Sequence, residues 1–241
     1  MSMYNDALVK IPAKYIIYAH TLFAYSAFFI ALIIGCYTHY DKIVENEYFG
    51  FPQEWFPSVS ATIGDRYPAR AIFQILIALT SGPRFALIGL NYLYQHTRIT
   101  KAGLSEILLG IGLIRTVACG GWVYITSTDD HSIHDIAMII YLLCTLPWQL
   151  GVLYTTDAKL YPTALKRRRY LTMAFFGTLP FMIYFYIQHK VNHIPGAYTI
   201  YALFEWSLII YDIAFDATAA FEFKRFEIKV TQKEKKKETI V

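Results

Sequence analysis

The stretch YIIYAHTLFAYSAFFIALIIGCYT, residues 15–38, contains no Asp, Glu, Lys or Arg. A helix needs about 20 mostly apolar residues to cross the hydrocarbon core of a bilayer, so this stretch predicts a transmembrane helix. It follows Lys10 and Lys14 as a signal peptide would, but it is longer than a signal h-region and has no clear small-x-small cleavage site. We therefore expect a retained membrane anchor.

Five further apolar stretches follow, at residues 70–94, 103–126, 134–155, 170–188 and 198–221. The chain is 56% hydrophobic and 17% charged, whereas a soluble domain carries about 25% charged residues. This composition excludes disorder, its small net charge of +4 argues against a nucleic-acid binder, and three Cys cannot form a disulfide scaffold. We expect an all-α polytopic membrane protein, with six transmembrane helices in residues 1–226 and a polar, disordered tail at 227–241.

The Lys and Arg residues predict the orientation, because cytosolic loops carry the basic excess. Sixteen of the 22 lie in the N-terminal segment, the second and fourth connections and the C-terminal tail. The other connections hold Lys42, Arg66, Arg70 and Lys190. Both termini should therefore be cytosolic, and the first, third and fifth connections should be luminal.

Charged residues inside the spans are costly in lipid and are functional suspects. The sixth span carries Glu205, Asp212 and Asp216, whose spacing places all three carboxyls on one stripe about 16 Å long. Counting from the helix starts, we expect Arg84 at the depth of Asp212 and Arg115 nearer that of Glu205. The cluster forms either interhelix ion pairs or a polar cleft that holds a lipid headgroup or a proton path.

Histidines gather at the predicted luminal side, where His134 follows Asp130 and precedes Asp135, and His189 ends the fifth span. A His with a carboxylate is the usual acid/base unit, so we assign these four residues a catalytic role. Several His with an Asp also suit zinc, but no HExxH or Cys-His framework accompanies them, and we expect no metal and no cofactor. Plain interfacial polarity is the remaining interpretation.

The first connection supplies candidate phosphate contacts. Arg66 and Arg70 present the forked donors that suit phosphate, and we group them with the intramembrane charges as substrate-binding residues. Ser58, Ser60 and Thr62 alternate with apolar residues, which predicts three hydroxyls along one edge of an extended segment.

Several motifs carry a family resemblance: FPSVS at 56–60, with Ile63-Gly64, Pro68-x-Arg70 and Pro83-Arg84-Phe85 after it. With GGWVYITSTDDH at 120–131 and FEWS at 204–207, the chain resembles the six-span family that remodels GPI-anchor lipids. It is similar both to the post-GPI-attachment-to-proteins factor two type and, in particular, to the N-terminal membrane half of the fungal calcofluor-white-hypersensitivity remodelase.

The resemblance implies exchange or reacylation of the lipid of GPI-anchored proteins, in the endoplasmic reticulum or Golgi membrane or at the plasma membrane. It also implies GPI-anchored proteins and membrane lipids as partners. The fungal relative has a second, phosphodiesterase-like half, whereas the present sequence ends at Val241. We expect either a separately encoded membrane protein of that type as a further partner, or a sequence that is part of a longer protein. A non-catalytic lipid-binding scaffold and a lipid transporter or scramblase are the alternatives to an enzyme or enzyme subunit.

Overall fold

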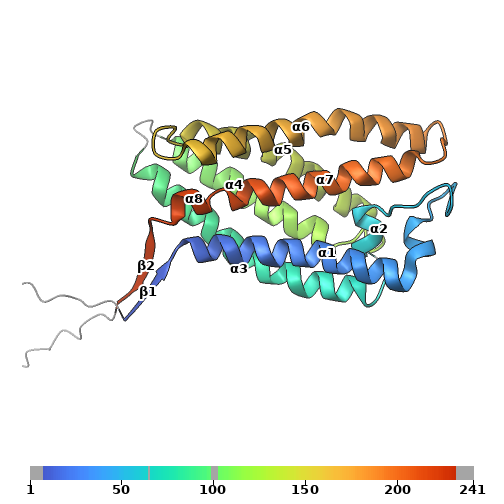
Figure 1. Cartoon of the computed structure of the whole chain (residues 1–241), viewed down its shortest axis with the longest axis horizontal. Helices are drawn as coiled ribbons and strands as arrows, with labels where there is room; N and C mark the ends of the chain where they lie inside the picture. The colour runs from blue at the N-terminus through green and yellow to red at the C-terminus, as the bar shows by residue number, and fades with distance from the viewer. Residues whose placement is uncertain (1–7, 65, 99–102, 232–241) are drawn as a thin grey trace, which may run out of the picture.

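The long helices lie side by side in one elongated bundle (Figure 1), as seen in a computed structural model that describes residues 8–64, 66–98 and 103–231. The long helices are α1 (Lys14–Val44), α3 (Ala69–His96), α4 (Leu104–Tyr124), α5 (His131–Thr155), α6 (Pro162–Lys190) and α7 (Ala197–Ala217). Two short helices, α2 (Val59–Gly64) and α8 (Ala220–Phe223), complete the helical part. Each long helix coincides with one of the six apolar stretches of the sequence.

Five helices of the described chain, α1, α3, α4, α5 and α6, are long and apolar enough to cross a membrane. The chain is therefore an all-α, multi-pass membrane protein. The acidic helix α7 runs along the same bundle between α1 and α6 (Figure 1). Its role as the sixth span and the cytosolic position of both termini remain predictions.

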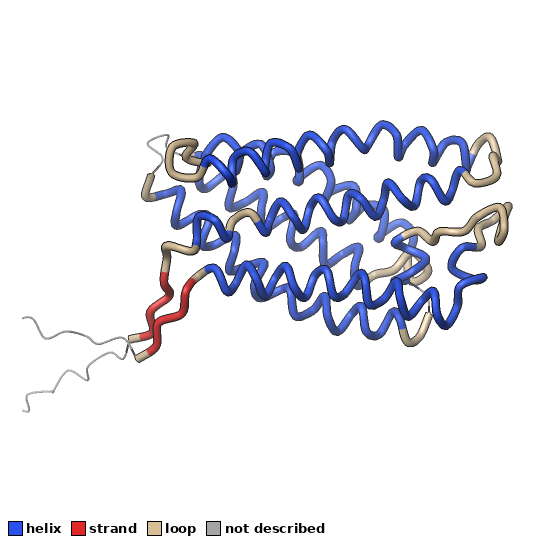
Figure 2. The backbone as a smooth tube through the Cα atoms, in the orientation of Figure 1, coloured by secondary structure: helices blue, strands red, loops and turns tan. Residues whose placement is uncertain are grey.

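Two short strands leave the bundle at the end that carries both termini (Figure 2). Strand β1 (Val9–Pro12) pairs antiparallel with β2 (Glu227–Val230), with Val9 opposite Val230. Residues 227–230, which the sequence assigned to a polar tail, thus form a strand, because a second edge is available to pair with their backbone. The tail from 232 onward lies outside the described residues. We call this the strand end of the bundle and the opposite one the α2 end.

The sequence prediction of an extended edge at Ser58, Ser60 and Thr62 is wrong, because residues 59–64 form helix α2. Two acceptors stabilise the first turn of α2: the Ser58 hydroxyl accepts from Ala61 N at 3.1 Å and the Glu205 carboxylate accepts from Val59 N at 2.8 Å. Helices begin with backbone N–H groups that need such partners. The Glu205 acceptor comes from a distant helix and is invisible to local sequence patterns.

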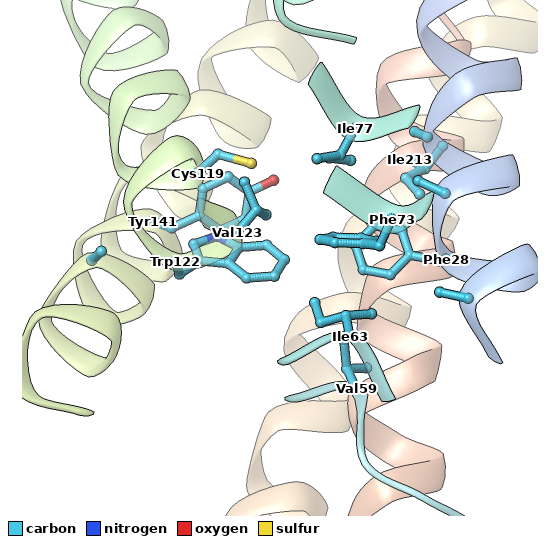
Figure 3. Packing of buried hydrophobic residues seen from close by; sticks show 14 of the residues in the cluster. Phe28, Val59, Ile63, Phe73, Ile77, Cys119, Trp122, Val123, Tyr141 and Ile213 are labelled. Carbon is cyan, nitrogen blue, oxygen red and sulfur yellow. The ribbon is translucent and has the colours of Figure 1, made fainter. Parts of the chain in front are cut away.

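The core at the α2 end joins residues of α1, α2, α3, α4, α5 and α7 (Figure 3). Val59 and Ile63 of α2 lie beneath Phe28 of α1 and Phe73 of α3, whose ring centroids are 5.1 Å apart. Trp122 of α4 belongs to the same buried cluster. Helix α2 therefore packs against α1, α3 and α7 at this end of the bundle.

Close helix contact explains two of the glycines in α4. A Cβ on Gly112 would lie 2.8 Å from the Trp148 ring, and one on Gly121 would lie 2.7 Å from the Ala137 Cβ. Both distances are too short for real side chains, so α4 and α5 approach each other this closely only because glycine has no Cβ. His134 and Tyr141, which are discussed below, belong to the α5 helix that packs here.

Candidate functional site

Arg115 of α4 lies at the centre of a buried charge cluster. Its Nη2 is 2.5 Å from Asp212 Oδ1, and its Nη1 is 3.2 Å from Asp216 Oδ2. The remaining donors reach α5: Nε bonds Thr145 Oγ1 at 3.1 Å and Nη2 bonds the Tyr141 hydroxyl at 3.0 Å. Tyr141 in turn donates to the second oxygen of Asp212. One cation thus pairs with two buried carboxylates.

Arg84, which the sequence placed at the depth of Asp212, is not the cation that pairs with this aspartate, and the expected depth of Arg115, near Glu205, is wrong. Helical side chains point back toward the N-terminus of their helix, so Arg115 reaches toward the strand end and meets Asp212 and Asp216. Arg84 faces α1 instead, where its Nε lies 3.3 Å from His20 Nε2. Counting residues along two helices estimates depth, but it says nothing about which faces meet.

Glu205 is separated from the two aspartates that share its stripe. Its carboxylate accepts from Val59 N, at the start of α2. Glu54 plays a similar part on the preceding segment: it is fully buried and accepts from Gly196 N at 3.0 Å, Thr199 N at 2.8 Å and the Thr199 hydroxyl at 2.7 Å. The buried carboxylate of Glu54 and the half-buried carboxylate of Glu205 therefore attach the first connection to the N-terminal half of α7.

A cavity of about 430 Å³ opens at the α2 end. Its walls come from the first and third connections and from α5, α6 and α7, and the lining includes His134, His189, Asp135, Ser58, Ser60, Lys190, Tyr198 and Tyr201. Two histidines that are 55 positions apart in the chain therefore share one cavity, as the sequence hypothesis required.

His134 is buried in the first turns of α5, and its Nδ1 lies 2.9 Å from the Ile125 carbonyl oxygen. A carbonyl only accepts hydrogen bonds, so Nδ1 carries the proton of the neutral ring. This leaves Nε2 with its lone pair, and Nε2 is the ring nitrogen available to the cavity. The arrangement fixes the tautomer that a proton acceptor needs.

His189 is held by aromatic rings rather than by a carboxylate. Its ring centroid is 5.0 Å from that of Tyr198 and 5.6 Å from that of Tyr48. Its Nδ1 is buried without a hydrogen-bond partner among the described residues. The next residue, Lys190, places Nζ 2.8 Å from Glu47 Oε1; this ammonium group holds the Glu47 pKa below its usual range, so the ion pair persists at neutral pH.

The expected His134–carboxylate dyad is not formed. Asp130 is the N-cap of α5, where its side chain accepts from Ile133 N at 2.9 Å. Asp135 lies 3.3 Å from His131 instead. An aspartate just before a helix accepts hydrogen bonds from the free N–H groups of the first helical turn. Because Asp130 makes such a bond, its carboxylate does not pair with His134.

Neither of the two arginines of the first connection lines the cavity. Arg70 Nη2 lies 2.5 Å from Asp129 Oδ2 and so joins α3 to the third connection. Hydrogen bonds from Thr126, and then Arg70, lower the Asp129 pKa. Arg66 is half-buried, and its carbonyl accepts from Arg70 N. The cation that the cavity does contain, Lys190, was not among the predicted binding residues.

A narrow, mainly apolar extension leads from the cavity toward the charge cluster. The two spaces share Ser60, His134, Met138, Met182 and Tyr201. The extension continues past Glu205, Leu142, Phe175 and Leu208, and reaches Tyr141 and Asp212. A polar chamber at the α2 end thus continues into an apolar slot along α5, α6 and α7, a shape that suits an amphiphile. Among the described residues, no group of three or more His, Cys, Asp or Glu is placed to hold a metal ion.

The Frag1/DRAM/Sfk1/Cwh43P N-terminal domain model matches residues 12–226, which include every helix of the bundle. The chain belongs to this family. The match covers both ends of the bundle, and so the cavity at the α2 end and the buried cluster lie within the family's domain. No solved structure matches this member of the Frag1/DRAM/Sfk1/Cwh43 family.

Two kinds of relative are similar to this Frag1/DRAM/Sfk1/Cwh43 member. Protein cwh43 of Schizosaccharomyces pombe is 48% identical over 216 residues, which make up 88% of this chain. The aligned part is 21% of that relative, so the chain spans about a fifth of it. Post-GPI attachment to proteins factor 2 of Caenorhabditis briggsae is 27% identical over 96% of this chain and 93% of its own. Acyltransferase PGAP2 of Xenopus tropicalis is 28% identical, covering 73% and 74%.

Sequence reasoning missed several residues that build the site in this Frag1/DRAM/Sfk1/Cwh43 chain. Tyr198 donates to the Ser58 hydroxyl at 2.8 Å, and both residues line the cavity. The FPSVS motif at 56–60 pointed to Ser58, but nothing pointed to its partner. Tyr141 and His20 were missed because single polar residues in apolar helices carry no pattern; only their neighbours on other helices reveal their roles.

Proposed function

We propose that this chain remodels the lipid of GPI-anchored proteins, by exchange or reacylation, at the cavity of the α2 end. The observation that carries the proposal is the union of a polar chamber with an apolar slot at His134. Relatives named as post-GPI attachment factors and as an acyltransferase support the substrate class. The substrate's phosphate-bearing part would occupy the chamber and its hydrocarbon the slot.

Lys190 and the Tyr198–Ser58 pair would position the polar part of the lipid. Lys190 lines the cavity, and its ammonium group would attract phosphate as a point charge. The tyrosine and serine hydroxyls supply donors to ester and hydroxyl oxygens. Ser58 and Tyr198 come from the first connection and α7, so the anchoring of that connection by Glu54 and Glu205 keeps this set together.

His134 would act as the proton acceptor of the reaction. In reacylation, the free hydroxyl of a lyso-lipid attacks the carbonyl carbon of an acyl donor, and Nε2 accepts the hydroxyl proton. The tetrahedral intermediate collapses as the C–O or C–S bond to the leaving group breaks, and the imidazolium returns the proton to that group. In exchange, the hydroxyl of the incoming lipid would attack the phosphorus of the GPI phosphodiester while Nε2 accepts its proton, and the P–O bond to the outgoing lipid would break as the imidazolium returns the proton to that oxygen.

A second candidate function is a lipid-presenting subunit without its own chemistry. The specific observation in its favour is that Asp130 and Asp135 are occupied elsewhere, so His134 is oriented by a backbone carbonyl and not by a carboxylate. In that case a phosphodiesterase-like membrane protein would complete the reaction. The site of action would be the endoplasmic reticulum, Golgi or plasma membrane.

The deciding experiment is reconstitution of the purified chain in liposomes with lyso-GPI or diacyl-GPI as substrate and acyl or ceramide lipids as donors. Mass spectrometry of the GPI lipid reads out transfer. Remodelled product from the chain alone establishes an enzyme. Substrate that binds and is not converted, together with conversion after a partner is added, establishes the presenting subunit. Lack of both binding and conversion refutes the proposed function.

A further inference from the structure

A second cavity, larger than the one with the histidines, lies nearer the strand end and measures about 880 Å³. It is a groove whose floor includes Ala214 and Ala217 of α7 and whose walls are Tyr25 of α1 and the first three turns of α6. The proposed function does not use it. Its residues therefore call for a separate explanation.

Polarity changes along this groove. Lys166 and Arg167, in the first two turns of α6, line its mouth, and both are exposed. Deeper in the groove are Leu171 and the alanines of α7, as far as Tyr25. Tyr25 lies eleven residues into α1, which is about 16 Å along the helix axis. A cationic mouth above an apolar trough has the polarity of a single phospholipid molecule.

The side chains of the basic run at 166–169 point in different directions. Arg168 turns into the bundle, where it binds Glu222 at 2.7 Å and donates to Thr218 at 2.8 Å. Arg167 stays at the mouth, with its guanidinium 5.0 Å from the centre of the Phe221 ring. Arg169 is exposed and does not line the groove. The fold thus commits one arginine to structure and leaves two cations facing the groove.

We infer that this groove binds an anionic glycerophospholipid of the adjacent leaflet. Its phosphate and acidic headgroup would lie between Lys166 and Arg167, and one acyl chain would run over Ala214 toward Tyr25. A lysine or arginine near a membrane surface attracts anionic lipid, and the apolar trough distinguishes a seated lipid from general surface attraction. The inference does not rest on the proposed function, since the two cavities lie toward opposite ends of α6.

The test is native mass spectrometry of the full chain, delipidated and titrated with phosphatidylserine or phosphatidylcholine. We expect phosphatidylserine to bind preferentially, and Lys166→Gln with Arg167→Gln to weaken its binding on the order of tenfold. The matched control is Lys159→Gln with Arg169→Gln, which removes the same charge from residues outside the groove and should leave binding within about twofold of wild type. Equal loss in both pairs would reduce the effect to net charge and overturn the site.

A second arm tests the trough. Ala214→Trp fills it without changing charge and should abolish phosphatidylserine binding; Ala214→Leu should weaken it if the tryptophan variant does not fold. Glycerophosphoserine, which has the headgroup without acyl chains, should not compete. Full binding by a folded Ala214 variant, competition by the chainless headgroup, or preferential displacement by an acyl-coenzyme A would each overturn the assignment to a bilayer phospholipid.

Discussion

Arg115 of α4 and Asp212 of α7 form a buried ion pair, with 2.5 Å between Nη2 and Oδ1 and about 3% and 8% of their side chains exposed. They are 97 positions apart in the chain. Asp216 and Tyr141 share the same guanidinium. The pair therefore ties α4, α5 and α7 together at a depth where neither charge would be tolerated alone.

The first prediction concerns this ion pair. Arg115→Ala leaves two carboxylates without their cation, and breaking a buried pair costs about 3–5 kcal/mol. Thermal unfolding in detergent should show this loss, and adding Asp212→Asn should restore part of it. Arg84→Ala provides the contrast, because Arg84 contacts His20 and not a carboxylate, so Asp212→Asn should not rescue it. Rescue of Arg84→Ala, or strict additivity with Arg115→Ala, would contradict the observed pairing.

Glu54 should matter far more than other acidic residues of the first connection. Glu54→Ala removes three hydrogen bonds to the start of α7, and each bond to a charged group is worth about 1.5–3 kcal/mol. We expect lower stability and faster proteolysis of residues 45–58. The control is Glu47→Ala, which breaks a half-exposed pair with Lys190 and should cost at most about 1 kcal/mol. Similar protease sensitivity in both variants would argue against the anchoring role.

His134→Ala and His189→Ala should abolish GPI-lipid remodelling while the protein remains folded and correctly located. The reason is that both rings line the cavity and His134 offers Nε2 to it. His96→Ala is a suitable control, since His96 lies at the other end of the bundle beside Glu106. Lipid species of GPI-anchored proteins are measured by mass spectrometry in cells at matched expression. Normal profiles for both cavity variants would remove the acid/base role and leave a binding subunit.

The orientation can be tested by inserted glycosylation sites. The basic asymmetry predicts that acceptor sequences in the first and third connections, residues 45–58 and 125–130, are modified. An acceptor in the fourth connection, residues 156–161, should stay unmodified because it lies at the strand end with the termini. Gel mobility before and after glycosidase treatment reads out the result. Modification of the fourth connection would reverse the topology.

The ion pair of Arg70 with Asp129 should give a pH-dependent contribution to stability. The folded-state pKa of Asp129 is lowered, mainly by hydrogen bonds from Thr126 and next by Arg70. A lowered carboxyl pKa stabilises the fold above the unfolded value, about 3.9, and the contribution disappears as pH falls through the folded value. Asp129→Asn should therefore be less stable than wild type at pH 6. The difference should begin to shrink below about pH 4 and disappear only below the folded-state pKa of Asp129. A gap that persists at acid pH would assign the effect to packing.

The sequence by itself determined the class of the protein and the position of its long helices. Span hydropathy depends on each stretch alone, so residues 15–38 predicted α1 without any knowledge of its neighbours. The stripe of Asp212 and Asp216 was readable for the same reason, because helix periodicity is local. The run at 166–169 hid the true start of α6 at Pro162, since charged residues lower hydropathy without interrupting a helix.

Only the tertiary structure decided which polar groups meet. Partner choice depends on the rotation and depth of each helix against the others, and neither is written in a single stretch. Arg115, not Arg84, therefore reached Asp212, and Glu205 was recruited by the first turn of α2. Packing of α5 against α6 and α7 also brought His134 and His189 to one cavity, whereas Asp130 caps the N-terminus of α5 and does not pair with His134. Properties of a single helix can be predicted from its own stretch of sequence. A site between helices depends on which helix faces pack together, and only the tertiary structure shows that.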